Sequence, residues 1–306
     1  MHLPQLRPIQ LMFACACATL AATNVSFAAD AEPSIQNYTL DWEAKILSDR
    51  RNRGTSDTFN QAGVEFGLTA AHESGFVGIL QLGTVRKEIF PNTNGLQVMG
   101  AVGYRWGKPD AWHFGLGLAQ EWFPSGELNG LPSGIDWASA SPTGLANTKF
   151  DTTYGVLEFG YGIVEARYLY VMSKDLRGNN TATICGSLYL PAVLAGGDPS
   201  QAMQCYGSEM KNSGGSQLLD VDVKYKLDGQ TKLIAHLGYQ KLRNFSGGDL
   251  FDSKIGIAHK RWGMEFAAEL VSARLRNADY GVAFDSNGKP ERIDKTALVF
   301  SVAKRF

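Results

Sequence analysis

The chain has 306 residues, with 29 Lys and Arg against 30 Asp and Glu, so its formal net charge of −1 gives no basis for binding nucleic acid. The length allows one large domain or two small ones, and a hydrophobic content of 44% is ordinary for a globular chain. A mean hydropathy of −0.15 argues against a membrane protein built of helices. It does not exclude one built of strands, because a barrel strand is apolar on only one side.

The first 28 residues have the pattern of a secretory signal peptide. Arg7 is the only formally charged side chain before Asp30, and an apolar stretch follows at residues 11–22. Ser26 and Ala28 then place small residues where a signal peptidase cleaves. The apolar stretch is too short for a membrane anchor. We therefore predict export, with residues 1–28 removed by cleavage near Ala28 and a mature domain spanning residues 29–306.

The rest of the chain alternates apolar and polar residues with a period of two, which is typical of β-strands. In the stretch YTLDWEAKI (38–46), apolar side chains at every second position from Leu40 to Ile46 alternate with polar ones. The same pattern recurs about twelve times, and each segment is long enough to cross a bilayer as a tilted strand of about 9–11 residues. The predicted strands are 37–50, 60–71, 75–87, 95–106, 111–123, 152–160, 163–173, 216–227, 231–243, 251–261, 263–276 and 294–306.

Short and long connections alternate between these segments. The short ones contain Gly, Asp or Pro in turn positions, as in HESG (72–75), GKPD (107–110) and DGQ (228–230). The long ones are 51–59, 88–94, 124–151, 174–215, 244–250 and 277–293. An up-and-down barrel in an outer membrane has short periplasmic turns and longer external loops. The fold class predicted is therefore an all-β transmembrane antiparallel barrel of about 12 strands, with 10 as the alternative.

Four cysteines divide into two pairs. Cys15 and Cys17 leave with the signal peptide, and the residues before Cys15 fit a lipid-attachment site poorly. Cys185 and Cys205 remain in a long connection, and an even pair in an exported chain predicts a disulfide that staples this loop.

Aromatic residues lie beside both kinds of connection, as expected for two girdles at the lipid interfaces. Those beside the short turns are Phe76, Trp106, Trp112 and Trp262. Those beside the long loops are Phe59, Phe90, Trp122, Phe245 and Phe251.

The C-terminal stretch ALVFSVAKRF (297–306) places Leu298, Phe300, Val302 and Phe306 on one face. We predict that it closes the barrel by pairing with the first strand, which leaves no open edge in lipid. A terminal aromatic after alternating apolar residues looks like the signal read by the barrel-assembly machinery of Gram-negative bacteria. Lys304 departs from that signal and is expected to snorkel into the interface.

Longer segments resemble a known family. SDRRNRGTSDTFNQAGVEFGLTAAHESGFVGI (48–79) resembles the start of the TorF-type (Gcw_chp family) outer-membrane porins, and DTTYGVLEFGYGIVEARYLY (151–170) and the C-terminal strand fit the same pattern. The loops 124–150 and 174–215 depart from it. The resemblance implies an outer-membrane barrel of porin type and carries over no catalytic residue.

Consistent alternation places a mixed set of charges inside the barrel. Because both signs are present, strong selectivity for anions or cations is not expected, and twelve strands leave a narrow pore, narrower still if the 174–215 loop folds inward. The residues predicted to line the pore are Asp41, Glu43, Lys45, Glu65, Arg105, His113, Glu121, Glu158, Glu165, Arg167, Asp220, Asp222, Lys224, Lys226, Lys254, Lys260, Glu265 and Glu269.

The function predicted is passive diffusion of small hydrophilic solutes across the outer membrane. One alternative is a barrel plugged by salt bridges, with a structural or ligand-binding role. A second is an outer-membrane hydrolase using His113 near Glu121, but no G-x-S-x-G or similar motif accompanies it. A third is a soluble carrier, which would place apolar residues inside and charges outside. We predict that the protein is not an enzyme and needs no metal or other cofactor, and that its partners are outer-membrane lipid, solutes and the assembly machinery.

Overall fold

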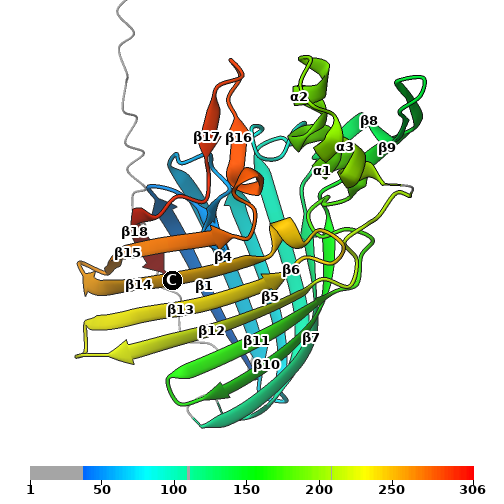
Figure 1. The fold of residues 1–306 in the computed structure, drawn as a ribbon. Helices are drawn as coiled ribbons and strands as arrows, with labels where there is room; N and C mark the ends of the chain where they lie inside the picture. The colour runs from blue at the N-terminus through cyan, green and yellow to red at the C-terminus, as the bar shows by residue number, and fades with distance from the viewer. Residues whose placement is uncertain (1–36, 109–110, 208) are drawn as a thin grey trace, which may run out of the picture. The chain divides into compact units, whose positions relative to one another are not determined.

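Twelve antiparallel strands close into a barrel in the computed structural model, which describes residues 37–306 except 109, 110 and 208 (Figure 1). The predicted fold and strand number are confirmed, whereas the predicted signal peptide lies outside the described residues. The barrel strands are β1 (Tyr38–Leu47), β4 (Gly63–His72), β5 (Phe76–Thr84), β6 (Leu96–Gly107), β7 (Trp112–Trp122), β10 (Thr152–Tyr161), β11 (Val164–Val171), β12 (Gln217–Lys226), β13 (Thr231–Lys241), β14 (Leu250–Arg261), β15 (Met264–Leu275) and β18 (Ala297–Arg305).

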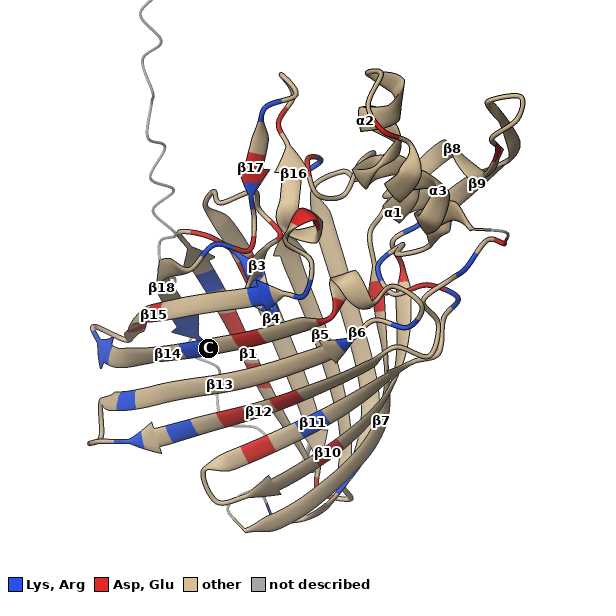
Figure 2. Ribbon diagram, in the orientation of Figure 1, with Lys and Arg blue, Asp and Glu red and all other residues tan. Residues whose placement is uncertain are grey.

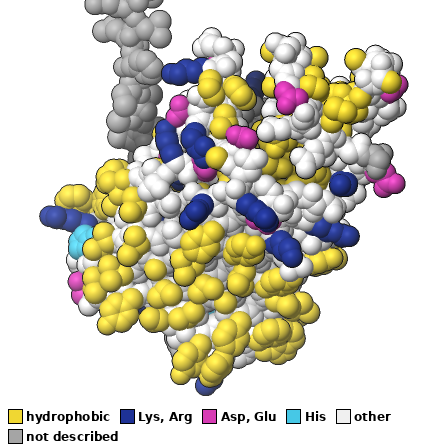
Figure 3. Space-filling view, in the orientation of Figure 1, with side chains coloured by type: hydrophobic (Ala, Val, Ile, Leu, Met, Phe, Trp, Pro, Cys, Tyr) yellow, Lys and Arg dark blue, Asp and Glu magenta, His cyan; other side chains and the backbone are white. Residues whose placement is uncertain are grey.

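Alternation along the strands separates two faces of the barrel wall. On β12, Leu219 is 45% exposed on the outside, whereas the neighbouring Asp220 is bonded to Arg53 on the inside. Outward side chains form a broad hydrophobic surface over the strands on the face shown in Figure 3. Apolar side chains outside and charges inside suit a barrel surrounded by hydrocarbon, and this polarity is the reverse of that of a soluble carrier.

The first and last barrel strands pair with each other, as predicted. β1 and β18 are antiparallel, with Ile46 opposite Val302 and Glu43 opposite Arg305. This pairing satisfies the backbone groups that would otherwise form two open sheet edges in lipid.

One end of the barrel carries only short connections, and we call it the turn end. Glycines permit two of these turns: Gly75 and Gly107 have φ angles of 103° and 93°, and a Cβ on Gly107 would lie 2.1 Å from the carbonyl oxygen of Trp112. The aromatic residues predicted at this end are exposed on the outer surface, as a lipid-interface girdle requires. They are Phe76, Trp106, Trp112 and Trp262.

The opposite end, which we call the loop end, carries structure where the sequence pattern predicted plain loops. Three hairpins form there: β2 (Arg51–Asn52) with β3 (Thr55–Ser56), β8 (Glu127–Asp136) with β9 (Ser141–Lys149), and β16 (Val282–Phe284) with β17 (Pro290–Arg292). The loop 174–215 contains the helices α1 (Thr181–Leu188), α2 (Leu190–Leu194) and α3 (Ser200–Tyr206). Two 3₁₀ turns, Ser246–Gly248 and Ala278–Gly281, lie in the remaining loops. Within the described part of the chain, no helix is both long enough and apolar enough to span a membrane.

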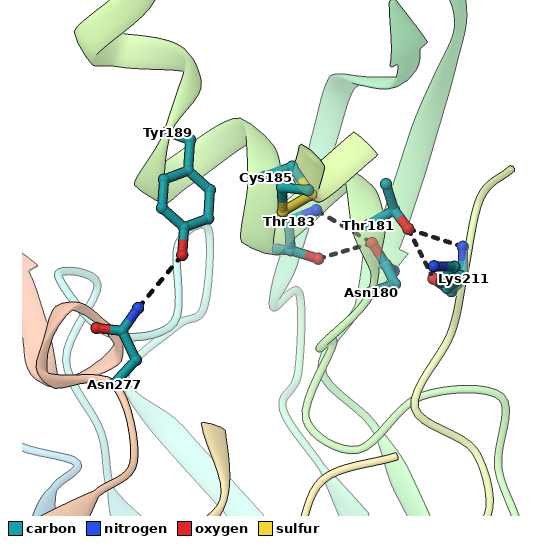
Figure 4. Close-up of a disulfide and its surroundings, with 8 residues drawn as sticks. Asn180, Thr181, Thr183, Cys185, Tyr189, Lys211 and Asn277 are labelled. Carbon is teal, nitrogen blue, oxygen red and sulfur yellow. Dashed lines mark hydrogen bonds between the residues drawn. A yellow bond between two sulfur atoms is a disulfide. The ribbon is translucent and has the colours of Figure 1, made fainter. Parts of the chain in front are cut away.

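The predicted disulfide is present and joins two of these helices. Cys185 in α1 and Cys205 in α3 have Cα atoms 5.6 Å apart (Figure 4). Asn180 begins α1 as its N-cap, and its side-chain oxygen accepts a hydrogen bond from the Thr183 amide at 3.1 Å. The bond therefore links helices, and the expectation that it staples an irregular loop was wrong.

Two hydrophobic clusters support the loop end. One packs loop residues such as Leu176, Ile184 and Phe245 against the inner wall of the barrel. The other gathers Phe90 with the neighbouring aromatic residues Phe123 and Phe150. Phe90 and Phe245 are therefore buried, and their assignment to a lipid-interface girdle was wrong, because loops that fold over the barrel need apolar cores of their own. Trp122 and Phe251 are exposed on the outer surface as predicted.

Candidate functional site: the barrel lumen

A cavity of about 560 Å³ occupies the lumen. All twelve barrel strands contribute to its wall, and residues 49–55 of the loop between β1 and β4 enter it from the loop end. Eight of the residues predicted to line the pore lie on it, and they are Lys45, Glu65, Glu121, Arg167, Asp220, Asp222, Lys254 and Glu269.

The other ten predicted residues lie on the inward face of their strands, closer to the turn end. The strand register shows this directly, because Glu158 pairs with Arg167, and Lys260 pairs with Glu265. These ten are Asp41, Glu43, Arg105, His113, Glu158, Glu165, Lys224, Lys226, Lys260 and Glu265. Whether any of the eighteen residues conducts a solute remains a prediction.

A hairpin crosses the lumen near the loop end. β2 and β3 are joined at Arg53 and Gly54, whose positive φ angles of 48° and 71° form a tight turn of the kind that favours Gly at its second position. Gly54 is required here for a second reason, since a Cβ on it would lie 2.7 Å from the carbonyl oxygen of Ser272. The family-like stretch RNRGTS (51–56) thus places Arg51 and Arg53 at the cavity, with Arg53 at the tip of the hairpin.

Arg53 reaches the far wall of the barrel. Its Nη2 lies 2.8 Å from both carboxylate oxygens of Asp220, and its Nη1 lies 3.8 Å from Asp252. The hairpin emerges between β1 and β4, and β12 is five strands from β1 and six from β4 around the ring. The contact therefore joins the hairpin to the wall on the far side of the ring.

The carboxylates at the far wall are also compensated by wall residues. The two ring nitrogens of His236 each lie 2.9 Å from a carboxylate oxygen, one of Asp222 and one of Asp252. Arg167 donates to Asp222 at 2.7 Å. The acidic groups on β12 and β14 are thus held together by Arg53 from the hairpin and by His236 and Arg167 from the wall. Figure 2 shows that acidic and basic positions are interspersed along the barrel strands.

Arg50 anchors the base of the hairpin loop. Its guanidinium contacts Asp57 and Glu65, each at 3.0 Å, and donates to Gln97 on β6. Gly83 makes room for it, because a Cβ there would lie 2.3 Å from the Arg50 Nε. The loop is therefore held against the wall at its base and across the lumen at its tip.

Arg177 joins this loop to the loop that follows β11. Its guanidinium donates to Glu121 at 3.0 Å and to Asp57 at 3.1 Å, and it lies 5.4 and 5.5 Å from the ring centroids of Phe90 and Phe123. Burial disfavours its charged form, but the two carboxylates outweigh burial and raise the pKa of Arg177 well above its ordinary value. Arg177 therefore stays charged and holds the loop after β1 and the loop after β11 together at the loop end.

Ion pairs continue toward the turn end. Arg105 contacts Glu158 at 2.5 Å, with the His113 Nε2 3.6 Å from the same carboxylate. His113 is not paired with Glu121 as the hydrolase alternative required, because Glu121 lies near the other end of β7 and binds Arg177. Further inward pairs are Lys254–Glu269, Lys232–Glu265 and Arg305–Glu43.

Sequence reasoning missed the loop residues of the lumen. Arg53, Asp57 and Arg177 belong to connections, where alternation gives no direction for a side chain. Arg50 ends the predicted strand 37–50, where alternation with Asp41, Glu43 and Lys45 would point it outward. Asp252 on β14 was also missed, although its position two residues before Lys254 places it on the same inward face. The sequence signal for the hairpin was an Arg-Gly pair flanked by short polar residues.

Known proteins similar to this chain are barrels and members of one bacterial family. The family model described as "Bacterial protein of unknown function (Gcw_chp)" matches residues 30–306. No curated protein matches the sequence. The KdgM porin is 6% identical, with 87% of this chain and 97% of that chain covered and a TM-score of 0.42, and a further KdgM structure is a complex with disordered oligogalacturonate. The NanC porin is 10% identical, with coverages of 87% and 98% and a TM-score of 0.41. Pseudomonas aeruginosa OprD is 10% identical, with coverages of 87% and 66% and a TM-score of 0.35.

Proposed function

Because the chain belongs to the Gcw_chp family of bacterial proteins and folds into a closed twelve-stranded barrel, we propose that it is an outer-membrane channel for small hydrophilic solutes. The observation that carries the proposal is the cavity of about 560 Å³ lined by all twelve strands, with charged groups inside and apolar side chains outside. We further propose that the protein reaches the outer membrane after cleavage of residues 1–28.

The geometry makes the channel a narrow one. The Arg53 contact with Asp220 joins the hairpin to the far wall, so solutes pass beside the hairpin and not through the full width of the barrel. Because acidic and basic groups are interspersed and mostly paired, the channel discriminates weakly between small anions and cations.

Electrical recording tests the channel. Protein purified in detergent is inserted into planar lipid bilayers, and single-channel conductance is measured in KCl. We expect small, discrete conductance steps and swelling of liposomes in small polar solutes. Absence of steps from protein that shows the heat-modifiable gel migration of a folded barrel would overturn the proposal.

A plugged barrel with a structural or ligand-binding role is the second candidate. It is favoured by Arg177, which bonds Asp57 and Glu121 and so joins two loops over the mouth. In that case the native protein shows no conductance, and replacement of both Arg53 and Arg177 opens it. Conductance of the native protein at the level of the double variant would exclude a plug.

A further inference from the structure

The lumen wall has an apolar side. Its inward residues on β5, β6, β7 and β10 include an uninterrupted patch without charge, which we call the apolar strip and which consists of Val77, Ile79, Ala101, Gly103, Gly117 and Val156. The strand register makes them neighbours, because Ile79 pairs with Ala101, Gly103 with Gly117, and Gly117 with Val156.

The apolar strip faces the inside of the barrel and is open to it. Ile79 is 38% exposed although it lies on the inward face of β5, and Val77, Ala101 and Val156 are half-buried. The glycines leave a groove of about 80 Å³ along the wall, and Arg105 and Glu158 line it together with the strip. A groove of this volume accommodates the apolar part of a small molecule and not a whole solute.

The wall opposite the strip is charged. β13, β14 and β15 lie six strands away from β5, β6 and β7 respectively in the ring of twelve. They carry His236, Lys254 and Glu269 on the cavity. The strip therefore has ionic groups next to it in the same groove, from Arg105 and Glu158, and further ionic groups on the strands six positions away around the ring.

We propose that the lumen favours amphipathic organic solutes, with an aliphatic or aromatic part and a charged or polar group, over uniformly polar solutes of similar size. This inference rests on the proposed channel function. The apolar part of the solute contacts the strip while its polar group remains near the charged wall, so both faces of the lumen are complementary to one molecule. A uniformly hydroxylated solute gains nothing from the strip.

Bi-ionic reversal potentials test this selectivity in bilayers in which KCl conductance has first been established. The probes are the sodium salts of hexanesulfonate and gluconate, which are six-carbon anions with an apolar and a hydroxylated chain. We expect hexanesulfonate to be the more permeant by about fourfold or more, the effect of one methylene removed from water.

Matched variants test whether the selectivity arises at the apolar strip. Val156→Thr replaces one methyl group by a hydroxyl of similar size, and Ile79→Thr replaces the ethyl branch by a hydroxyl, so in both variants the permeability ratio should fall toward one. Val64→Thr is the control, because Val64 is on β4, next to β5, and faces outward away from the groove. It should keep the native ratio.

Several outcomes contradict the inference. Equal permeability of the two anions in a conducting native channel overturns it and leaves the channel function intact, whereas a barrel that does not conduct KCl overturns both. A ratio that the strip variants do not change also overturns it. If another part of the chain covers the strip, Val156→Thr should lower the heat stability of the barrel and leave the permeability ratio unchanged. That result would also contradict the inference.

Discussion

Arg53 attaches the tip of the β2–β3 hairpin to the far wall of the barrel through a single guanidinium. Hydrogen bonds to charged groups contribute about 1.5–3 kcal/mol each, and Arg53 makes two such bonds to Asp220. In Arg53→Ala the hairpin loses its attachment to the far wall, while His236 and Arg167 still compensate the acidic groups. We expect larger single-channel conductance than in the native protein.

Arg53→Lys is the matched control for that prediction. It keeps the charge but has one nitrogen in place of the two that face Asp220 and Asp252, so its conductance should lie between those of the native protein and of Arg53→Ala. Equal conductance in all three proteins would show that the hairpin does not limit the pore.

Arg177 joins two loops at the loop end through its contacts with Asp57 and Glu121. Arg177→Gln leaves the carboxylates of Asp57 and Glu121 buried without their shared partner, and breaking a buried pair in this way costs roughly 3–5 kcal/mol. The loops should detach from the wall while the strands stay paired. Limited proteolysis should then cleave the loop after β11 much faster than in the native protein.

Lys174→Gln provides the control for Arg177. Lys174 is exposed in the same loop, so its loss of charge should not change the cleavage rate. Equal cleavage rates in Arg177→Gln and Lys174→Gln would contradict a role for Arg177 in holding the loops.

Among the elements, the helices α1 and α3 depend on the disulfide between Cys185 and Cys205. Closing a loop of 20 residues stabilises it by about 3 kcal/mol in the chain-entropy model. In the double variant Cys185→Ser/Cys205→Ser, the helices should become protease-sensitive, whereas the barrel should keep its heat-modifiable migration. Loss of that migration would show that the barrel itself needs the bond.

The barrel strands and the loop elements differed in how well the sequence predicted them. All twelve barrel strands follow from alternation, because each must present an apolar face to its surroundings along its whole length. The hairpins and helices at the loop end were not predicted. The hairpin β2–β3 is only two residues long on each side, and α1 spans only eight residues, so neither gives a long periodic pattern.

For the whole molecule, Phe306 packs against the first barrel strand. Phe306 is 54% exposed, and the centroid of its ring lies 4.7 Å from that of Trp42 on β1. The Lys304 ammonium lies 4.9 Å from the centroid of the Phe306 ring. Deletion of Phe306 removes this contact and the terminal aromatic that the assembly machinery is expected to read. We expect much less folded barrel in the outer membrane, measured as the heat-modifiable fraction in membrane extracts.

Phe306→Tyr should preserve assembly, since it keeps the ring. A deletion variant that assembles as well as the native protein would contradict an assembly role for Phe306. Deletion should also leave detergent-refolded protein able to form the barrel, because the β1–β18 register extends to Arg305 without it.

The sequence by itself determined a closed barrel of about 12 strands, with 10 left open, its polarity and the Cys185–Cys205 bond, because alternation and an exported cysteine pair are local signals. Only the tertiary structure decided which loops enter the lumen. Arg53 and Asp220 are 167 residues apart, and Arg177 and Asp57 are 120 apart. No local pattern encodes such contacts, since they exist only after the strands have closed and brought opposite walls of the barrel within reach of one side chain.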